Sequence, residues 1–527
     1  MAWRNTVSSP LFYVAFCAAT VLVLKEVNSV VWEPYMDEPF HVPQAQAYCE
    51  SKWEVWDPKI TTPPGLYMSA VIIRKIFMFK CRLPLLRLVP ALHLLSLPLS
   101  LHALELYHQR LPSSQDILTT PLSSVVLASF PPLWFFGFLF YTDVPGIAFV
   151  LAAFVMQANG SNWMTALLGL WSLFFRQTNI IWILYIFAYH TVRTLRFAQR
   201  RPTERSLHDP PALQSSFLDL AHSARSLLYL LPSLFWDFLP YGLLTALFGA
   251  FVVWNGGIVL GDKSNHIPAL HIPQLFYFYA FVTALGWPAL LLSGVGPTAG
   301  PIGLSKEVYR RMFGTPTRVM MTIGWTILIM ACVQLFTIHH PFILSDNRHY
   351  TFYIWKRVLF RHRFIPFLMS PLYLACWWAW WIRVGSVQSM LQTLLLPLAL
   401  IPTLLPSPLL EPRYFLVPYV FLRLQVPPYE ETKEEGNGTK GTLEPDTLLN
   451  EISSNPPEGE NTVRRPKRVS SGKIAQMHRR GIDWSEYLPW IELVWYTAIN
   501  GITMYVFLYK DRTVDTIHGE EVIRFMW

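Results

Sequence analysis

An apolar segment, LFYVAFCAATVLVLKEV at residues 11–27, is followed shortly afterwards by YMDEPFHVPQA at residues 35–45. The first segment is close to the length of about 20 apolar residues that crosses a bilayer as a helix. The second places two adjacent carboxylates, Asp37 and Glu38, and the imidazole of His41 where such a helix would emerge. This arrangement predicts a membrane protein with a polar site at one face of the bilayer.

The composition of the whole chain supports the membrane assignment. Of its 527 residues, 52% are hydrophobic and only 14% are charged, with a mean hydropathy of +0.31. Soluble domains carry about 25% charged residues. Apolar runs of spanning length recur as far as residue 508. We therefore expect an all-α polytopic membrane protein of roughly 12–14 transmembrane helices, with short loops and juxtamembrane helices. The first apolar segment should be a retained helix, because no small-residue cleavage site follows it.

The net charge of +8 does not indicate nucleic-acid binding, because the cations gather in a few hydrophilic loops. By the positive-inside rule, these loops are expected to be cytosolic. The three basic clusters are Arg193, Arg196, Arg200, Arg201 and Arg205; Lys306, Arg310, Arg311 and Arg318; and Arg464, Arg465, Lys467, Arg468, Lys473, Arg479 and Arg480.

Tracing the chain between these loops gives the expected topology. The segment 8–30 crosses from the cytosol and delivers residues 35–45 to the opposite side. Pro39 and Pro43 are expected to keep that loop from being helical. Pro43 is also well placed to open a short helix. Residues 61–77 are broken by prolines and could be re-entrant. Further spans are expected near residues 84–106, 117–140, 144–158, 163–189, 234–254, 272–293 and 319–338. Two or three more are expected between residues 364 and 425, and a last one near 486–508.

These spans divide the chain into three regions. Residues 1–426 form the transmembrane domain, in which residues 31–62 are the first loop on the far side. Residues 427–483 are rich in Glu, Lys, Gly and Pro, a composition typical of disorder. Residues 484–527 hold the last span and a tail. The polar loop carries a glycosylation sequon at Asn437, but its basic end predicts a cytosolic position where that sequon is not used.

The five cysteines do not predict a disulfide framework. Three of them, Cys17, Cys332 and Cys376, lie inside apolar runs. Cys49 and Cys81 could in principle pair, but the spacing alone does not predict that they do.

Further polar side chains are expected on the same side as Asp37, Glu38 and His41. Each small group alone could equally be helix-end residues at the lipid headgroups. Both signs of charge converge there, however, and carboxylates can take a proton from a hydroxyl while cations can hold a phosphate. The groups are Asp143; Arg176; Lys263, Asn265 and His266; Asp346, Asn347, Arg348 and His349; and Glu411 with Arg413.

The pattern resembles a known family. An acidic first loop on the luminal side is typical of membrane glycosyltransferases of the GT-C type, which use lipid-phosphate sugars as donors. Within that superfamily, seven motifs in order are similar to the endoplasmic-reticulum dolichyl-phosphate-glucose α-1,2-glucosyltransferase family. They are MDEPFHVPQAQAYC, ITTPPGLY, FYTDVPG, FRQTNIIW, GDKSNH, SDNRHYTFYIWKR and EPRYFLVPY. The resemblance covers about residues 30–425 and the final span, but not the loop at 427–483.

The resemblance implies a reaction and its partners. Glucose would pass from dolichyl-phosphate-glucose to a dolichyl-diphosphate-linked oligosaccharide, as the terminal glucose of the N-glycan precursor. The donor is β-linked and the product α-linked, so a single inverting displacement is implied, with a base for the acceptor hydroxyl and a stabilised phosphate leaving group. The enzyme would be a multi-pass endoplasmic-reticulum membrane protein facing the lumen, a monomer among membrane lipids, with no nucleic-acid partner.

The same resemblance suggests roles for the residues. Asp37 is favoured as the base, with Glu38 as an orienting or acceptor-binding neighbour, although the reverse assignment stays open. No metal or other cofactor is expected, because the chain lacks a DxD-type metal motif and cationic side chains can stabilise a phosphodiester leaving group. Arg348, Arg413 and Lys263 are unranked candidates for the phosphate.

The remaining candidates would bind substrate. Asp143 could bind acceptor hydroxyls or simply cap the helix that follows it. His41 is expected to be a hydrogen-bond partner, and His266 and His349 are expected to contact sugar hydroxyls. The other members of the predicted binding site are Arg176, Asp346 and Glu411.

Two other functions are compatible with parts of this pattern. A transporter would also carry charged residues in its membrane domain, but it tends to show two related halves. We see no internal repeat, and the charges lie in loops on one side. A mannosyltransferase would use the same chemistry with a different sugar pocket.

Overall fold

The structure is a computed structural model of the 527-residue chain. It describes residues 9–109, 120–197, 206–264, 267–427, 429–430, 484–516 and 519–527. His266, Asn265, Arg200, Arg201, Arg205, the third basic cluster and Asn437 lie outside these residues, as does the predicted polar loop except at positions 427, 429 and 430.

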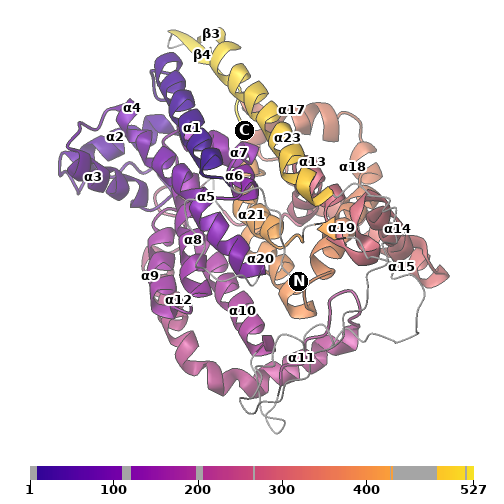
Figure 1. The fold of residues 1–527 in the computed structure, drawn as a ribbon. Coiled ribbons are helices and arrows are strands. Elements are labelled where there is room, and N and C mark those ends of the chain that lie inside the picture. The colour runs from indigo at the N-terminus through magenta and orange to yellow at the C-terminus, as the bar shows by residue number, and fades with distance from the viewer. Residues whose placement is uncertain are drawn as a thin grey trace, which may run out of the picture.

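The described chain is a bundle of helices, in agreement with the predicted all-α membrane class (Figure 1). Seven segments are long and apolar enough to cross a membrane, or eight if one sharply bent pair counts as a span. The predicted number of roughly 12–14 is larger, because several further apolar helices are shorter than a bilayer requires. The seven segments are Pro10–Val30, Leu83–Gln109, Phe217–Asn255, Pro273–Leu292, Pro316–Phe336, Ile365–Gly385 and Tyr487–Tyr509.

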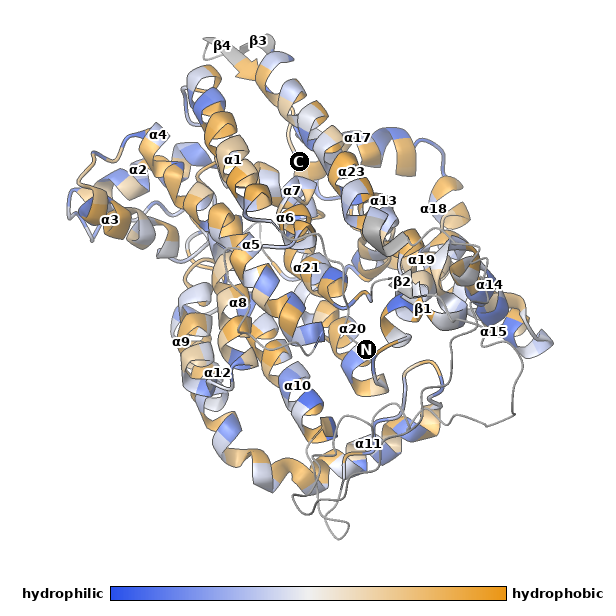
Figure 2. Ribbon diagram, in the orientation of Figure 1, coloured by the Kyte–Doolittle hydropathy of each residue, from blue (hydrophilic) through white to orange (hydrophobic). Residues whose placement is uncertain are grey.

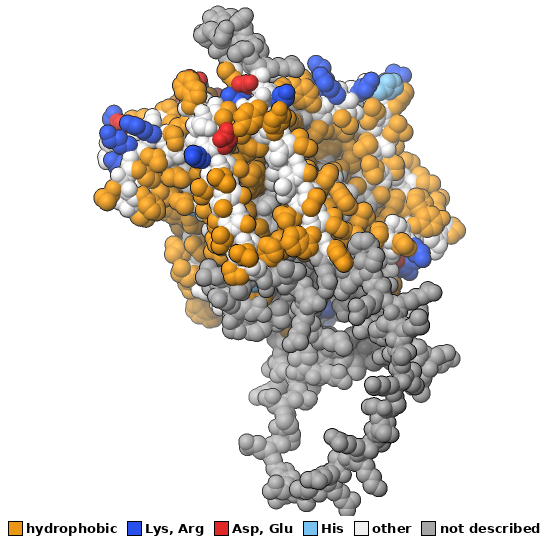
Figure 3. Space-filling view, turned by 45° about the horizontal axis from the view of Figure 1, so that its top comes forward, with side chains coloured by type: hydrophobic (Ala, Val, Ile, Leu, Met, Phe, Trp, Pro, Cys, Tyr) orange, Lys and Arg blue, Asp and Glu red, His pale blue; other side chains and the backbone are white. Residues whose placement is uncertain are grey.

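Hydrophobic side chains cover the outside of this bundle. In Figure 2 the long helices are hydrophobic along most of their length, and in Figure 3 a broad hydrophobic band lies below a rim that carries Lys, Arg, Asp and Glu. Exposed Leu, Ile, Val and Trp side chains are abundant on the spans, as expected where lipid replaces water. The surface therefore has the character of a membrane-embedded protein.

The N-terminal part builds the first wall of the bundle and a side lobe. α1 (Pro10–Val30) contacts α5 (Leu88–Gln109), while α2 (Glu38–Cys49), α3 (Gly65–Phe77) and α4 (Leu83–Leu86) project to one side (Figure 1). The helices that follow are α6 (Leu122–Ala128), α7 (Pro131–Phe135), η1 (Phe136–Phe138), α8 (Asp143–Ala158), α9 (Asn162–Leu173) and α10 (Asn179–Phe197).

The central part holds three of the seven candidate spans found among the described residues. Its elements are α11 (Phe217–Leu230), η2 (Leu231–Leu234), α12 (Phe235–Asn255), α13 (Pro273–Leu292), β1 (Gly294–Val295), η3 (Gly296–Thr298), α14 (Gly300–Phe313) and α15 (Pro316–Phe336). β1 pairs in parallel with β2 (Tyr429–Glu430).

The last part completes the core. It contains α16 (Pro341–Ser345), α17 (Tyr350–Tyr353), η4 (Ile354–Leu359), α18 (Ile365–Leu368), α19 (Ser370–Gly385), α20 (Met390–Leu404), η5 (Pro412–Phe415), α21 (Leu416–Leu424), α23 (Trp484–Tyr509), and the antiparallel strands β3 (Arg512–Thr516) and β4 (Gly519–Ile523). The β3–β4 hairpin stands at the end of α23 (Figure 1).

Three expectations about these elements are wrong. The span expected at 117–140 is broken into α6, α7 and η1, because Pro131 and Pro132 interrupt the helical hydrogen bonds, and the chain then bends by 118° into α8. The hydrophilic loop expected to carry the first basic cluster, residues 191–226, is not simply a loop: α10 continues to Phe197, and α11 begins at a capping box made by Ser216 and Asp219. The helix near Pro43 begins earlier, at Glu38, and includes Pro43.

Cys49 and Cys81 form a disulfide bond, contrary to the sequence-based expectation. α2 and α3 pack against each other, so the end of α2 meets the segment that follows α3. A hydrogen bond from the Gln46 side chain to the Cys81 carbonyl, at 3.0 Å, joins the same two segments. The contact depends on how the chain folds back over residues 50–80, which the spacing of two cysteines does not reveal.

Candidate active site

Asp37 stands at the N-terminus of α2. Its carbonyl oxygen accepts hydrogen bonds from the backbone N–H groups of Phe40 and His41, at 3.1 and 3.2 Å. The preceding residue, Met36, has a φ of 60°, a left-handed conformation that costs a residue with a side chain about 1–2 kcal/mol. This turn sends the Asp37 side chain away from the helix with 39% of its surface exposed. The positive end of the helix dipole favours a carboxylate at that position.

The nearest cation to this carboxylate is Arg413 of η5. Its Nη1 lies 3.0 Å from Asp37 Oδ2, and its Nε contacts the carboxylate of Glu411. Burial alone would raise the pKa of the Asp37 carboxyl, but Arg413 outweighs it and lowers the pKa below its usual value. Glu411 and Asp37 together overcome the effect of burial on Arg413 and hold its pKa well above the ordinary value. Both groups are therefore charged at neutral pH.

Glu38 points in a different direction from Asp37 and has no exposed surface. Its carboxylate accepts hydrogen bonds from Arg87 Nε at 2.8 Å and Nη2 at 2.5 Å, and from the backbone N–H groups of Tyr35 and Phe140 at 3.0 and 2.7 Å. A carboxylate with all these partners cannot contact a substrate in this conformation. Of the roles predicted for Glu38, namely orienting neighbour, acceptor-binding residue or base, this geometry fits the first.

His41 lies one turn along α2 from Asp37. Its Nδ1 is 2.6 Å from the hydroxyl of Tyr67 on α3, and its ring is near that of Tyr141. Burial lowers the pKa of His41, although the Asp37 carboxylate acts in the opposite direction. The hydroxyl of Tyr141 accepts a hydrogen bond from the Asp37 backbone N–H at 3.0 Å. His41 is thus a hydrogen-bonded residue next to Asp37.

Asp143 and Arg176 form a second ion pair, with 2.7 Å between Asp143 Oδ1 and Arg176 Nη2. Asp143 opens α8 and is 2% exposed, while Arg176 lies in the turn between α9 and α10. Among the described residues, neither carboxylate oxygen of Asp143 nor Nε of Arg176 has a hydrogen-bond partner in addition to this ion pair. The guanidinium also stands 5.6 Å from the ring centre of Tyr414, the residue after Arg413. The two ion pairs are therefore linked through η5.

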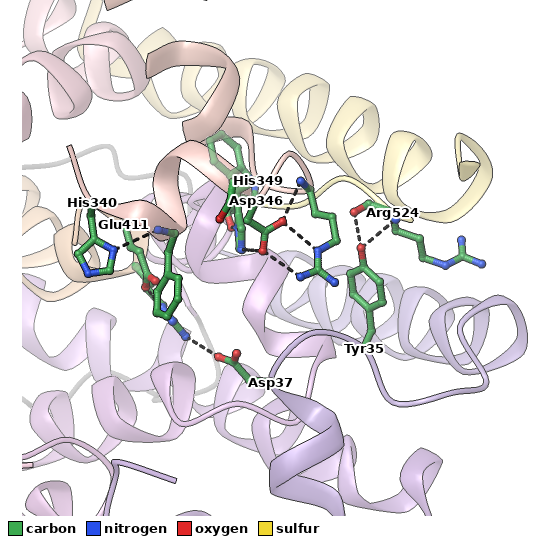
Figure 4. A network of polar contacts seen from close by, with 12 residues as sticks. Tyr35, Asp37, His340, Asp346, His349, Glu411 and Arg524 are labelled. Carbon is green, nitrogen blue, oxygen red and sulfur yellow. Dashed lines mark hydrogen bonds and ion pairs between the residues drawn. The ribbon is translucent and has the colours of Figure 1, made fainter. Parts of the chain in front are cut away.

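The segment 346–349 supplies a third group of charges. Asp346 accepts hydrogen bonds from Arg348 Nε at Oδ1, at 2.9 Å, and from Arg348 Nη2 at Oδ2, at 3.0 Å. His349 Nε2 lies 3.8 Å from the same Oδ2. The close view in Figure 4 shows Asp346 and His349 between Glu411 on one side and Tyr35 on the other, with Asp37 below them. His349 also contributes to the lowered pKa of Asp37, after the larger effect of Arg413.

Lys263 is not joined to this cluster by any contact among the described residues. Its Nζ donates to the carbonyl of Asn255, the last residue of α12. The negative end of the helix dipole stabilises a cation at that position. The loop around it packs on the side lobe, because Leu260 and Asp262 donate backbone hydrogen bonds to Thr61 and Pro58 at 3.1 and 2.7 Å. Of the three candidate cations for the phosphate, Arg413 is in contact with Asp37.

Sequence reasoning missed Tyr35, Tyr67, Arg87 and Tyr141. Arg87 had a visible signal, since a lone arginine in the apolar run LPLLRLVPAL requires a buried partner. The three tyrosines had none, because aromatic residues are abundant throughout the chain. Tyr67 is placed by Gly65, whose N–H donates to the Phe174 carbonyl at 2.8 Å where a Cβ atom would lie 2.5 Å from that oxygen.

The described residues contain no group of three or more His, Cys, Asp or Glu side chains that could hold a metal ion. The cluster instead interleaves arginines with carboxylates: Arg413 between Asp37 and Glu411, Arg176 beside Asp143, and Arg348 beside Asp346. Such a site can accept a proton at one point and bind a phosphate at another.

A polytopic helical membrane domain with paired acids and arginines at one loop cluster fits the class of membrane-bound transferases. The chain belongs to the DIE2/ALG10 family, whose family model matches residues 31–424.

Three relatives illustrate the similarity, and each is named Dol-P-Glc:Glc(2)Man(9)GlcNAc(2)-PP-Dol alpha-1,2-glucosyltransferase. The protein from Rattus norvegicus is 36% identical over 427 residues, covering 77% of this chain and 86% of its own. One from Homo sapiens is 33% identical and covers 96% of both chains. The protein from Arabidopsis thaliana is 28% identical and covers 76% of this chain and 87% of its own. No solved structure matches this chain.

Proposed function

We propose that this chain transfers glucose from dolichyl-phosphate-glucose to the lipid-linked oligosaccharide Glc(2)Man(9)GlcNAc(2)-PP-Dol in α-1,2 linkage. The observation that carries the proposal is the half-exposed carboxylate of Asp37, held 3.0 Å from Arg413 in a chain of this family. The relatives' names supply the donor, the acceptor and the linkage.

Asp37 acts as the general base. Its carboxylate takes the proton of the acceptor 2-hydroxyl while that oxygen attacks the anomeric carbon of the donor glucose. The bond from the anomeric carbon to the phosphate oxygen breaks in the same step, and dolichyl phosphate leaves in ionised form. The configuration inverts, because attack and departure occur on opposite faces.

Arg413 stabilises the phosphate that leaves. Before the donor binds, its charge is shared between Asp37 and Glu411. The donor phosphate competes for the same guanidinium and weakens the pair with Asp37, so the pKa of the carboxyl rises towards that of a useful base. Donor binding therefore activates the carboxylate. Arg348, paired with Asp346, is a second arginine of the site.

Other polar groups bind the sugars. Asp143 can accept hydrogen bonds from hydroxyl groups, because apart from the ion pair with Arg176 its oxygens receive none from the described residues. His41 and His349 lie beside Asp37 and can contact hydroxyls next to the reacting one. Glu38 and Arg87 hold the base in place without contacting substrate.

The active site faces the lumen of the endoplasmic reticulum in this proposal. The disulfide bond between Cys49 and Cys81 supports this orientation, since such bonds persist in the oxidising lumen and are rare in the cytosol. It lies in the same lobe as α2, which carries Asp37 at its start.

Direct transfer tests the function. The purified protein is incubated with dolichyl-phosphate-glucose and the diglucosylated acceptor, and the glycan is analysed by mass spectrometry. One added hexose, with an α-1,2 linkage confirmed by linkage analysis, is the expected result. Dolichyl-phosphate-mannose serves as the competing donor, and a preference for mannose would replace this proposal with a mannosyltransferase.

Chelation should leave transfer unchanged. Arginine side chains stand where the donor phosphate is proposed to bind, so a divalent cation has no required role there. Initial rates are compared with and without EDTA after dialysis. Loss of activity in EDTA that manganese or magnesium restores would contradict the expectation.

Asn437 should carry no glycan when the protein is made in eukaryotic microsomes. The basic end of its loop predicts a cytosolic position, on the opposite side from Asp37. Endoglycosidase treatment of the parent and of Asn437→Gln gives the measurement. A mass shift seen in the parent and absent from the variant would place the loop in the lumen.

A further inference from the structure

A segment far from the predicted site in sequence, residues 524–527, lies directly against it. Tyr35, two residues before Asp37, donates its hydroxyl proton to the Arg524 carbonyl at 2.5 Å. The same hydroxyl oxygen accepts a hydrogen bond from the Arg524 backbone N–H at 2.8 Å. Figure 4 shows this double contact beside the charged cluster. Burial raises the pKa of Tyr35 to about 12, so the hydroxyl keeps the proton that it donates.

The other edge of the segment binds the loop that carries Arg348 and His349. The Met526 N–H donates to the Arg348 carbonyl at 2.8 Å, and the Tyr350 N–H donates to the Met526 carbonyl at 2.9 Å, which forms a parallel bridge. His349 Nδ1 lies 2.7 Å from the Trp527 carbonyl oxygen. A carbonyl only accepts, so Nδ1 carries the proton and Nε2 is directed towards Asp346.

The Arg524 side chain anchors the segment to two membrane helices. Its Nη1 donates to the carbonyls of Phe507 and Leu508 at 3.1 and 2.8 Å, in the last turn of α23. Its Nη2 lies 3.4 Å from the carbonyl of Val30, the last residue of α1. An arginine at a helix C-terminus can donate hydrogen bonds to the last carbonyls, and the negative end of the helix dipole stabilises its charge. The segment is therefore held against the bundle as well as against both loops.

We propose that residues 524–527 are a positioning element of the transferase site, which fixes the distance between the loop of Asp37 and the loop of Arg348 and His349. Tyr35 links the element to the base, because its backbone N–H also donates to the Glu38 carboxylate at 3.0 Å. The bridge at Met526 links the element to the cations. The segment does not contact the reacting atoms itself. This inference rests on the proposed function, since it concerns the geometry of that reaction.

Tyr35→Phe tests the first link. It removes one hydroxyl and keeps the ring that packs edge-on against Phe507 at 5.8 Å. We expect kcat to fall by about 10- to 100-fold, as for a catalytic group displaced by a fraction of an ångström, with KM for dolichyl-phosphate-glucose nearly unchanged. Tyr350→Phe is the matched control, because its buried hydroxyl has no hydrogen-bond partner among the described residues, and it should behave as the parent.

The pH dependence separates positioning from a loss of folded protein. Arg413, His41, Tyr141 and His349 face Asp37, and Arg413 lowers its pKa most strongly. If the loop moves, that ion pair lengthens and the pKa of Asp37 rises. The acidic limb of kcat/KM should therefore move to higher pH in Tyr35→Phe. A smaller fraction of folded enzyme would lower the rate at every pH and leave the limb in place.

Met526→Pro tests the second link, because proline removes the N–H that donates to the Arg348 carbonyl. If one element joins the two loops, the variant carrying both substitutions should be about as slow as the slower single variant, since the effects are coupled. The inference would be overturned if the fold-decreases in kcat of the two single variants multiplied in the double variant. It would also be overturned if Tyr35→Phe matched Tyr350→Phe in kcat and pH profile. An inactive parent enzyme would instead count against the proposed function.

Discussion

Asp37→Asn should give a folded enzyme that has lost nearly all transfer. An amide cannot accept the hydroxyl proton, and removal of a general base typically lowers kcat by about 10²- to 10⁴-fold. Stability should change little, because Asp37 is 39% exposed and an ion pair of this kind contributes at most about 1 kcal/mol. The measurement is kcat per folded molecule, with the unfolding temperature recorded for the same sample.

Glu33→Gln is the matched control for this substitution. It changes an acid to an amide in the same loop, on a residue that is exposed to solvent. We expect parent-like kcat and stability. An Asp37→Asn enzyme that turns over at the rate of Glu33→Gln would show that Asp37 is not the base.

Glu38→Gln should have its largest effect on stability. The substitution leaves the Arg87 guanidinium buried, with 0% of either side chain exposed in the parent pair, and without its counter-charge. Breaking such a pair from one side costs about 3–5 kcal/mol. Thermal unfolding in detergent should therefore shift strongly downward, while kcat per folded molecule falls less than in Asp37→Asn.

The double variant Glu38→Gln with Arg87→Met separates the cost of an unpaired buried charge from the cost of altered packing. Without the unpaired cation it should recover part of the stability lost by Glu38→Gln alone. A Glu38→Gln enzyme with parent stability and no turnover would exchange the roles of the two acids.

The long apolar segments were predictable because hydrocarbon length and charge exclusion act locally along the chain. α13 and α23 agree with the predicted spans to within a few residues. The breaks inside the membrane domain were harder to predict, since a run such as 117–140 is apolar enough to span and only the prolines decide where its helix stops.

The site was predicted as a set of segments, but not as a set of contacts. Asp37 and Arg413 were both candidates, and nothing in the sequence showed that residues so far apart would meet. Adjacent residues at a helix start differ in direction by about 100°, so Asp37 and Glu38 face different surroundings. Glu38 is the buried one of the two because Arg87 lies beside it, and that position is known only from the structure. The pairing of Cys49 with Cys81 depends on the same long-range packing.

The bend of 118° between η1 and α8 limits how this protein can be engineered. Replacing helix breakers by good helix formers is a common route to thermostable variants. At Pro131 and Pro132, the first two residues of α7, such a change would join α6 to α7 and shift the stretch that leads to Phe140 and Tyr141. The Phe140 N–H now donates to Glu38 at 2.7 Å, and the Tyr141 hydroxyl accepts a hydrogen bond from the Asp37 backbone N–H. A shift of this stretch would withdraw the Phe140 donor and the Tyr141 acceptor from the acidic loop. Stabilising designs should therefore keep this irregular stretch and place their substitutions at lipid-facing positions elsewhere.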